Sequence, residues 1–562
     1  MGQVASNVAR CCLALLLVGA TAVHTFAERR KVEIRHADFW RSLNRGDEKI
    51  NRLIGNVELF HNETTMTCDS AYLYPDNRFE AFGRVVINKD TTWLFGDYMD
   101  YQGSADVGKV RGRLVTMLDG EMRLRTQFLD FNTSTNVAFF FNGGTLDNAQ
   151  NLLESNQGYY YSDQKLAVFN RKVEMKNEEY RIKSDSLHYL TEQDVATFFK
   201  QTYIWHEDGF LAFRQGYYNR PNDHFFMSNH VYMMNDKQES WSDSAHYYRA
   251  QKEGEMFSNV QLYDSSQHAM ALGDYAKLYE DRDLAYMTKN PVGVLFSEKP
   301  EDDTMFVKGD TLLVQRTPNT DSATMMLDST RRYMHAFYGV KFYHPDIQGA
   351  CDSLTYNAID SLGEMFYDPI LWNKENQLTA DKMEIYQKNN QLDRLEMIEA
   401  GFIASLDDSV KLYYNQIKGK LIVSHFAQND IYKVDVFGSG QTVYYLRDSL
   451  KLTGTLNVSS MDIFFYLKNR KIHKINYVSD VGSKTIPPKD INVKELTLKG
   501  FSWQQDRRPK SRYDITTRAI RPSLRQPSLA IEQPTYAITT RINGVKNAFF
   551  PPKELVQRST RP

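Results

Sequence analysis

Polar side chains, most of them aspartate, recur along this 562-residue chain at intervals near 29 residues. Each belongs to one local pattern, first seen at residues 66–73, with a small residue before it and alternating apolar residues after it. A ladder of carboxylates could bind calcium through oxygen ligands, or could cleave glycosidic bonds with paired acids. The eleven central positions are Asp69, Asp97, Gln127, Asn156, Asp185, Arg214, Asp243, Asp274, Asp310, Asp352 and Asp381.

Three of these positions favour architecture over chemistry, because Gln127, Asn156 and Arg214 replace the aspartate there. The glycine-rich calcium nonapeptide is also absent. Apolar residues lie at offsets −3 and −1 before the central position and at +2 and +4 after it. Strand side chains alternate with a period of two, so this change of parity needs an extra residue, as at a bulge or corner. A short acceptor there can bond a freed backbone N–H, and we therefore expect the recurring Asp to shape a corner.

A second strand pattern, Gly or Asn followed by x-Val-x-apolar, lies between the Asp-centred segments. It occurs at residues 55–59, 83–87, 229–233 and 290–294. Gly or Asn at its head suits a turn with positive φ. Two short strands in each period of about 29 residues, without helical periodicity before residue 500, predict an all-β fold. We expect a stacked-repeat β-jellyroll or solenoid.

The alternation predicts an apolar stripe on the inside of the stack. If the two walls of the stack close, the stripe is a core. If they splay, it is a groove for an elongated apolar ligand, to which each buried methylene contributes about 0.8 kcal/mol. The candidate lining residues are Val57, Leu59, Val85, Ile87, Val110, Leu114, Val231, Met233, Val260, Leu262 and Val292.

A basic rim on such a groove would suit a phosphorylated head group. The candidate contacts are Arg84, Arg111 and Arg113, with Arg123 and Arg125 as further candidates. The alternative is that these arginines only keep an exposed face soluble.

The first 27 residues have the features of a secretory signal: a cation at Arg10, an apolar run over residues 11–23 and a small residue at Ala27. No later segment reaches 18 apolar residues, so we expect an exported, periplasmic protein. The net charge of −2 gives no reason to expect nucleic acid as a partner. Cys68 and Cys351 occupy the same small position of the pattern and are predicted to be buried thiols.

The pattern divides the mature chain into two repeat stretches, residues 28–315 and 335–505. Residues 316–334 are rich in Asp, Thr and Ser and are predicted to form an insertion or boundary loop. Residues 506–562 hold 12 Lys and Arg against 4 Asp and Glu, together with 7 of the 16 prolines. We expect this basic tail to be disordered, or ordered only on a partner.

Motifs for enzymatic chemistry are absent. The sequence has no His-Glu-x-x-His zinc pattern, no nucleophile elbow, no phosphate-binding loop and no Cys-x-x-Cys. The thirteen histidines are scattered, and His230 and His246 fall at strand positions predicted to point outward. No catalytic residue, metal ligand or cofactor site is predicted, and we do not expect an enzyme.

The repeated Gly-x-Val-x-apolar and small-Asp-x-apolar-x-apolar strands resemble the OstA-like family over residues 50–310, and again over about 335–480. The segment 496–503, followed by Arg508 and Pro509, also resembles the large OstA-like proteins of Bacteroidetes. The family comprises periplasmic lipopolysaccharide-transport β-jellyrolls of the LptA type and the N-terminal domain of the outer-membrane protein LptD.

This resemblance implies a V-shaped jellyroll that carries the acyl chains of lipid A and bridges the inner and outer membranes. It also implies end-to-end stacking with other lipopolysaccharide-transport jellyrolls, or head-to-tail self-association. Two alternatives remain from the residues alone. One is an exported β-solenoid scaffold or adhesin with a closed core. The other is a glycan-cleaving enzyme that uses the recurring Asp side chains.

Overall fold

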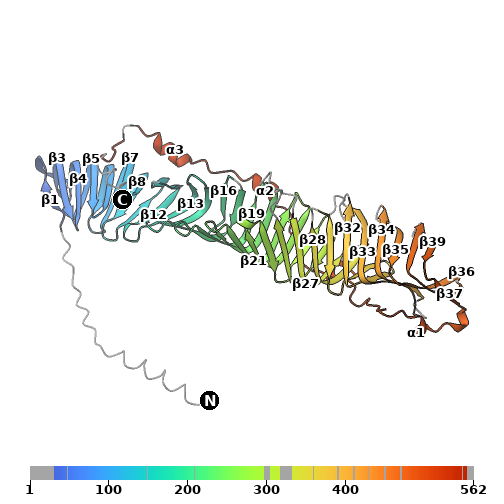
Figure 1. Cartoon of the computed structure of the whole chain (residues 1–562). Helices are drawn as coiled ribbons and strands as arrows, with labels where there is room; N and C mark the ends of the chain where they lie inside the picture. The colour runs from blue at the N-terminus through green and yellow to red at the C-terminus, as the bar shows by residue number, and fades with distance from the viewer. Residues whose placement is uncertain are drawn as a thin grey trace, which may run out of the picture. The chain divides into compact units, whose positions relative to one another are not determined.

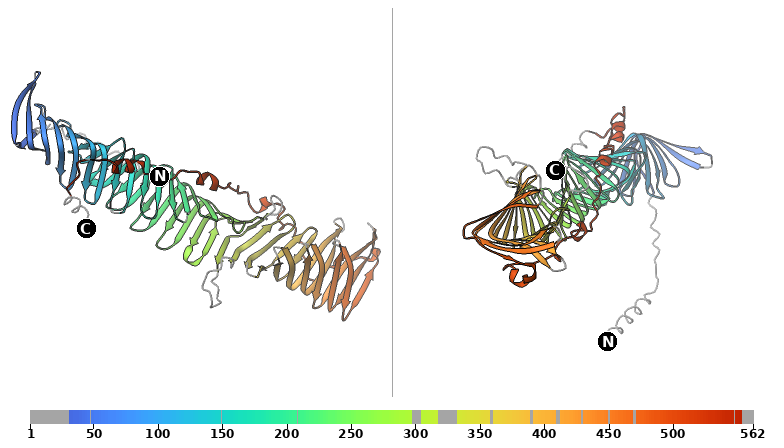
Figure 2. Two further views of the ribbon diagram at one scale, coloured as in Figure 1. Left: turned by 90° about the horizontal axis from the view of Figure 1, so that it is seen from above. Right: turned by 90° about the vertical axis from the view of Figure 1, so that its right-hand side faces the viewer.

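The computed structural model describes residues 31–552 except 47, 149, 208, 297–303, 317–331, 358–359, 389–390, 409–411, 428–429, 449–450, 469–470 and 547. The predicted signal sequence, most of the predicted insertion and the last ten residues lie outside the described residues. The chain divides into two compact units, residues 1–167 with 536–562, and residues 168–535. Each unit is a row of antiparallel strands that follow one another in the sequence (Figures 1 and 2).

The first strands are β1 (Glu33–His36), β2 (Phe39–Arg45), β3 (Glu48–His61), β4 (Thr64–Leu73), β5 (Arg78–Lys89), β6 (Thr92–Gln102), β7 (Val107–Asp119), β8 (Met122–Asn132), β9 (Val137–Phe140), β10 (Gly144–Asp147), β11 (Leu152–Ser155) and β12 (Gln157–Tyr161), followed by the 3₁₀ turn η1 (Ser162–Gln164). They are followed by β13 (Leu166–Lys176), β14 (Arg181–Leu190), β15 (Val195–Phe198), β16 (Thr202–His206), β17 (Gly209–Phe213), β18 (Gln215–Asn219), β19 (His224–Met234), β20 (Gln238–Tyr248), β21 (Glu253–Asp264), β22 (Ala269–Tyr279), η2 (Glu280–Arg282), β23 (Leu284–Thr288), β24 (Val292–Leu295), β25 (Met305–Lys308) and β26 (Thr311–Arg316).

The remaining strands are β27 (Arg332–Tyr343), β28 (Gln348–Asn357), β29 (Leu362–Phe366), β30 (Ile370–Asn373), β31 (Asn376–Thr379), β32 (Lys382–Lys388), β33 (Gln391–Asp408), β34 (Tyr413–Ala427), β35 (Asp430–Phe437), β36 (Gly440–Asp448), β37 (Lys451–Ser460), β38 (Asp462–Lys468), β39 (Lys471–Val478) and β40 (Gly482–Ile486). The chain ends with η3 (Pro488–Asp490), α1 (Val493–Leu496), η4 (Arg512–Asp514), α2 (Arg525–Leu529) and α3 (Ala537–Asn543). The predicted all-β repeat fold is confirmed.

A corner of two left-handed residues bends the sheet once per period. In β5 the corner is Gly83 and Arg84, with φ angles of +71° and +40°, and the pairing with β6 shifts register between Phe82 and Val85. Two corner residues therefore oppose a single residue of the neighbouring strand, as in a β-bulge. Such doublets recur at residues 55–56, 83–84, 142–143, 171–172, 229–230, 258–259, 289–290, 338–339, 367–368, 399–400, 438–439 and 479–480.

The recurring aspartate is the single residue opposite a doublet, as the change of parity predicted. Asp69 covers Gly83 so closely that a Cβ there would come within 2.3 Å of Asp69 Oδ2. Asp97 Oδ2 accepts a hydrogen bond from the backbone N–H of Arg113 at 2.9 Å. Asp38 occupies the same position opposite Gly55, and so adds an earlier copy that the sequence template missed.

Because the strands bend at these corners, the sheet in each unit folds into two facing walls. In the first unit, wall A includes residues 57–61, 64–68, 85–89 and 92–96, and wall B includes residues 51–54, 70–73, 78–82 and 98–102. In the second unit, wall A includes residues 231–234, 238–242, 260–264 and 269–272, and wall B includes residues 224–228, 244–248, 253–257 and 275–279. We call the bent edge the apex and the opposite edge, where the turns of the two walls meet, the mouth.

The core lies between the inner faces of the two walls. In the second unit, one buried cluster joins Val340 and Cys351 of wall A to Met365 and Met383 of wall B. Cys68 and Cys351 are buried free thiols, as predicted, and burial raises the pKa of each to about 12.

Residues 487–552, which we call the C-terminal segment, lie along the outer face of wall A (Figure 1). Residues 487–535 bind the second unit, and residues 536–552 bind the first. This differs from the prediction of disorder, which rested on the basic, proline-rich composition of residues 506–562. Prolines exclude this segment from a sheet, but they leave it free to lie extended against one.

Buried Gln and Glu side chains of wall A hold the C-terminal segment by its backbone. Gln377 donates to the Ser502 carbonyl at 2.6 Å and accepts from the Gln504 N–H at 2.7 Å. Gln261 makes the same pair of bonds to Arg521, at 3.0 and 2.9 Å. Gln416 makes a similar pair, donating to the Leu496 carbonyl and accepting from the Leu498 N–H. Glu239 in the second unit and Glu154 in the first accept bonds from backbone N–H groups of the segment but donate none. These polar side chains can be buried because the segment satisfies them.

Candidate functional site

The predicted inner stripe of the first unit lies in the interior. Val57, Leu59, Val85 and Ile87 are on the inner face of wall A, and Val110 faces them from wall B; all five are between 0 and 2 % exposed. Leu114 is buried beside a corner. The two walls therefore pack closely against each other at these positions.

In the second unit, Val231 and Val260 are buried on the inner face of wall A. Met233 and Leu262 follow them on the same face, one step nearer the mouth, and are half-buried. The interior is therefore less tightly closed toward the mouth than beside the apex.

Val292 lies on the other face of wall A, contrary to the prediction. It packs in a cluster with Leu272 and with Ile515 of the C-terminal segment. The pattern placed the corner at Asn290 and Pro291, but the proline ring fixes φ near −65° and excludes a left-handed conformation. The left-handed doublet lies one residue earlier, at Lys289 and Asn290. Because strand side chains alternate between faces, this shift of one residue turns the Val292 side chain from the inner to the outer face.

The arginines predicted as a rim do not lie together. Arg84 and Arg113 are at the apex, paired with Asp69 and Asp97 respectively. Arg111 is on the outer face of wall B, where it bonds Asp130 at 2.6 Å.

The two further candidates, Arg123 and Arg125, pair with Asp147 on the outer face of wall A, and Arg125 also bonds Asn543 of the C-terminal segment. Burial lowers the pKa of Arg125. None of the five arginines lies at the mouth.

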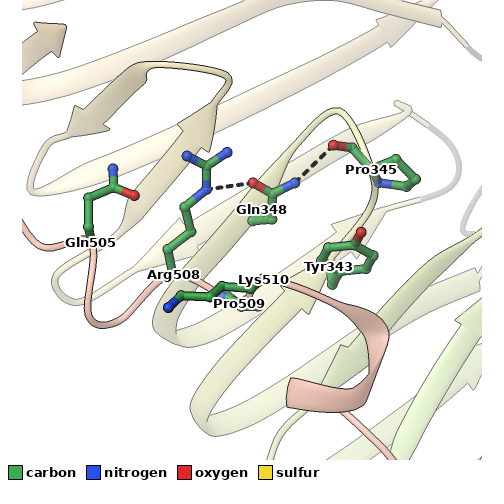
Figure 3. A pocket seen from close by; sticks show the side chains of 7 residues that line it. All are labelled: Tyr343, Pro345, Gln348, Gln505, Arg508, Pro509 and Lys510. Carbon is green, nitrogen blue, oxygen red and sulfur yellow. Dashed lines mark hydrogen bonds between the residues drawn. The ribbon is translucent and has the colours of Figure 1, made fainter. Parts of the chain in front are cut away.

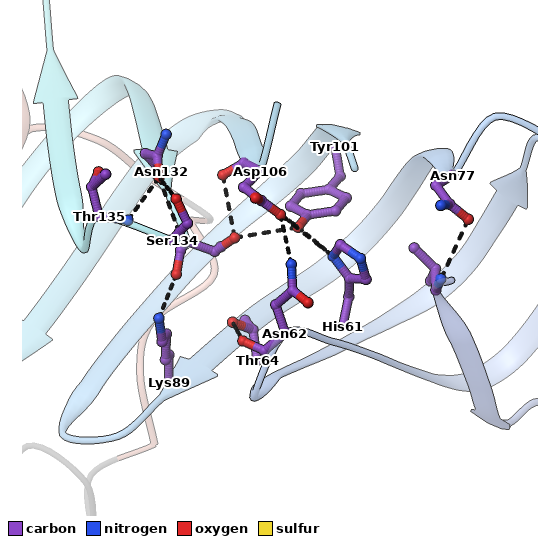
Figure 4. A network of polar contacts seen from close by, with 12 residues as sticks. His61, Asn62, Thr64, Asn77, Lys89, Tyr101, Asp106, Asn132, Ser134 and Thr135 are labelled. Carbon is purple, nitrogen blue, oxygen red and sulfur yellow. Dashed lines mark hydrogen bonds and ion pairs between the residues drawn. The ribbon is translucent and has the colours of Figure 1, made fainter. Parts of the chain in front are cut away.

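Polar side chains join the two walls across the mouth of the first unit (Figure 4). His61 Nδ1 of wall A lies 2.7 Å from Tyr101 Oη of wall B. Next to it, Asn62 Nδ2 donates to Asp106 Oδ1 at 2.8 Å. One turn further along wall A, the Lys89 ammonium donates to the carbonyl of Thr133 in a wall B turn. We call these wall-to-wall contacts latches.

Asp119 forms the next latch. Its side chain is fully buried, and both oxygens accept bonds from the Lys165 ammonium of wall B at 2.8 Å. Tyr160 of wall B donates to it at 2.9 Å, and Thr91 of wall A donates at 2.8 Å. A buried carboxylate needs such complete pairing.

The second unit has a latch of its own. Arg249 of a wall B turn donates to Glu179 Oε1 of a wall A turn at 2.9 Å, and its guanidinium lies 5.7 Å from the ring centre of Tyr180. This hydrogen bond holds the pKa of Glu179 below its usual value and raises that of Arg249.

Backbone hydrogen bonds near these latches join neighbouring turns of the same wall. The Thr133 N–H bonds the Asp106 carbonyl at 2.8 Å, and the Arg249 N–H bonds the Asp223 carbonyl at 3.0 Å. Sequence reasoning missed the latches, because each joins residues 40 or more positions apart on opposite walls. The sequence did contain one signal for the latches. Polar residues recur at the ends of wall A strands, at His61, Lys89 and Asp119.

Other features offer less chemistry. In the part of the chain that the structure describes, no three or more His, Cys, Asp or Glu side chains form a group able to hold a metal ion. His230 is exposed, and His246 is half-buried beside His224, with burial lowering the pKa of both His224 and His246. The described helices include none with the length and apolar character needed to span a membrane.

A pocket of about 300 Å³ opens in the second unit between wall A and the C-terminal segment (Figure 3). Its lining includes Tyr343 and Lys510, and Arg508 Nε donates to Gln348 Oε1 across it at 2.8 Å. The pocket belongs to the anchoring of the segment on the outer face, not to the interior.

Comparison with known proteins supports the resemblance found in the motifs. Residues 29–185 match the family model of the OstA-like protein. Among solved structures, LptH of Pseudomonas aeruginosa, described as the LptA homologous periplasmic component of the lipopolysaccharide transport device, is similar over 23 % of this chain and 82 % of that chain, at 10 % identity and a TM-score of 0.19. At that TM-score the assignment rests on the family match alone. No curated protein matches the chain. Residues 29–185 therefore match the OstA-like family, which the repeated motifs also resemble.

Proposed function

We propose that this chain is a periplasmic carrier of the lipopolysaccharide-transport type, exported by residues 1–27. It holds the acyl chains of lipid A between walls A and B and helps to bridge the inner and outer membranes. The observation that carries the proposal is the apolar interior, formed by the same strand positions from one period to the next within and beyond the OstA-like region. Acyl chains of comparable volume can replace such wall-to-wall contacts, since hydrophobic attraction is not directional.

The free edges of the repeat stretch support docking to other lipopolysaccharide-transport jellyrolls or to a second copy. β1 and β2 both pair with β3, and each has an edge without a strand partner among the described residues. Trp40 on β2 is exposed. Open edges offer unpaired backbone groups to an added strand.

Photo-crosslinking to lipopolysaccharide tests the proposal. A photoreactive residue at position 57, 85 or 231 should form lipid adducts, because these side chains line the interior. The same residue at position 84, on the apex beside position 85, should form none. Position 292 is a second negative control, because it faces the C-terminal segment.

The alternative is a scaffold without a lipid ligand, and the almost complete burial of Val57 and Val85 favours it. Absence of adducts at positions 57, 85 and 231 in folded protein would select this alternative. Adducts confined to those positions would exclude it.

A further inference from the structure

The interior of the first unit has one boundary that side chains alone hold closed. At the apex, covalent strands such as β5 pass from wall B to wall A without a break. Along each wall, neighbouring strands are joined by backbone ladders. On its outer face, wall A is covered by the C-terminal segment, where Glu154 accepts bonds from the Ile538 and Thr539 N–H groups. Only at the mouth do the walls meet through latches.

The side chains along one strand change from apolar to cationic as they approach the mouth. Val85, Ile87 and Lys89 alternate on β5 and therefore share one face, about 7 Å apart along the strand. Val85 and Ile87 are buried in the interior, whereas Lys89 reaches the mouth. This order, apolar then positive, complements an amphiphile whose acyl chain lies inside and whose anionic head group lies at the edge.

We propose that the mouth of the first unit is the lateral entry for the lipid and that Lys89 and Lys165 bind a phosphate monoester of its head group. The proposal rests on the proposed function and adds the site that selects the head group. The proposed head-group site consists of these two lysines instead of the scattered arginines. Lys89 extends from wall A toward wall B, and Lys165 extends from wall B toward wall A.

The present partners of both lysines permit their release. Lys89 donates to a neutral carbonyl, that of Thr133, and a phosphate oxygen is the stronger acceptor. Lys165 of wall B bonds Asp119, and when wall B moves away with Lys165 and Tyr160, Asp119 keeps the Thr91 hydroxyl donor of its own wall. When the mouth opens, the two lysines therefore exchange their present hydrogen bonds for bonds to phosphate. The buried Asp119 carboxylate still has a hydrogen-bond donor.

The two cations are close enough to act on one head group. Lys89 pairs in register with Thr92, and Thr92 pairs with Asp119, to which Lys165 binds. Two strand spacings place the wall A ends of the two latches about 10 Å apart.

A crosslink across the mouth tests the entry route. In the chain without residues 1–27, Asn62→Cys with Asp106→Cys places thiols at a latch, and a short dithiol reagent joins the walls there. Cys68 and Cys351 are buried with raised pKa values, so they should not compete. The matched control is Asp69→Cys with Arg84→Cys, which joins neighbouring strands at the apex.

Closing the latch should reduce lipid A adducts at a photoreactive residue 85 at least tenfold, and reduction of the reagent should restore them. The apex crosslink should have no effect. If the latched protein forms adducts as fast as the apex control, lipid enters elsewhere and the proposal is wrong.

Substitution of Lys89 tests head-group binding. Lys89→Gln should weaken binding of diphosphoryl lipid A about tenfold, the value of one charge-assisted hydrogen bond. It should leave unchanged the binding of the same lipid without phosphates. Lys109→Gln, on a wall B strand away from the mouth, is the control.

A binding measurement with inorganic phosphate distinguishes a site for the phosphate of a lipid head group from a site for free phosphate. Millimolar phosphate should not bind at the latch detectably by itself, since the acyl chains supply most of the affinity. Saturable phosphate binding lost in Lys89→Gln would mean a free-phosphate site and would overturn the proposal. If interior adducts form but Lys89→Gln changes neither lipid, the head-group site is wrong and the carrier function stands. If no adduct forms in any variant, the carrier function itself fails.

Discussion

At the scale of single residues, the fold depends on a few positions that accept a left-handed backbone. Gly83 combines positive φ with the close approach of the Asp69 carboxylate, so no other residue fits without displacing that side chain. Gly120 has a similar φ of +58° but nothing within 4 Å of a built Cβ. A side chain at Gly120 would meet backbone strain alone, whereas one at Gly83 would meet both backbone strain and a steric clash with Asp69.

Gly83→Ala should lower the free energy of unfolding by about 2–4 kcal/mol, because left-handed strain and displacement of Asp69 add together. Gly120→Ala should lower it by only about 1 kcal/mol, the strain alone. Urea unfolding of both variants measures the difference. Equal losses would mean that Asp69 moves aside freely and does not fix the corner.

Residue identity explains both the success and the failure of the predicted inner stripe. Val57 and Val85 lie where the pattern places them, because Gly55-Asn56 and Gly83-Arg84 both form left-handed doublets. Val292 does not, since Pro291 cannot take the second place of a doublet. That correction was available in the sequence, whereas the latches depend on which turns the fold brings face to face.

At the scale of elements, the C-terminal segment behaves as an added layer on wall A. Several rungs offer a buried Gln or Glu that pairs with backbone groups of the segment, and these bonds do not depend on the segment's side chains. The basic, proline-rich composition of residues 506–562 predicted disorder because it carries no sign of these backbone anchors. Isolated Gln residues such as Gln377 and Gln261 carry no repeat signal, and only their burial beneath the segment shows their role.

Gln377→Glu should loosen the segment locally. The acceptor for the Gln504 N–H remains, but a carboxylate now faces the Ser502 carbonyl in place of a donor, which should cost about 1–3 kcal/mol. Limited proteolysis within residues 500–512 should become faster at neutral pH. Gln387→Glu, at an exposed position of wall B, should not change the cleavage rate. Equal protection in both variants would refute the anchoring role of Gln377.

At the scale of the whole molecule, the C-terminal segment covers apolar surface that the repeats do not. Phe210, Tyr232 and Trp241 lie on the outer face of wall A in a cluster that includes Ile531. An uncovered aromatic face of this kind promotes association.

Deletion of residues 487–562 should leave the repeats folded but raise the binding of an apolar fluorescent dye several-fold and cause self-association. Circular dichroism, dye fluorescence and light scattering measure these three effects. A monomeric truncated protein with unchanged dye binding would contradict the covering role of the segment.

The latches also show that the two walls are out of step. Asn62 meets Asp106, and Lys89 meets Thr133, each 44 residues further along the chain, about one and a half periods. A stack built with this stagger cannot end flush. At its beginning, β2 extends wall B past wall A, with Trp40 on the inner face 62 % exposed. If another jellyroll docks at this end, as proposed above, it meets two edges at different heights, so one offset between neighbours should be favoured over all others.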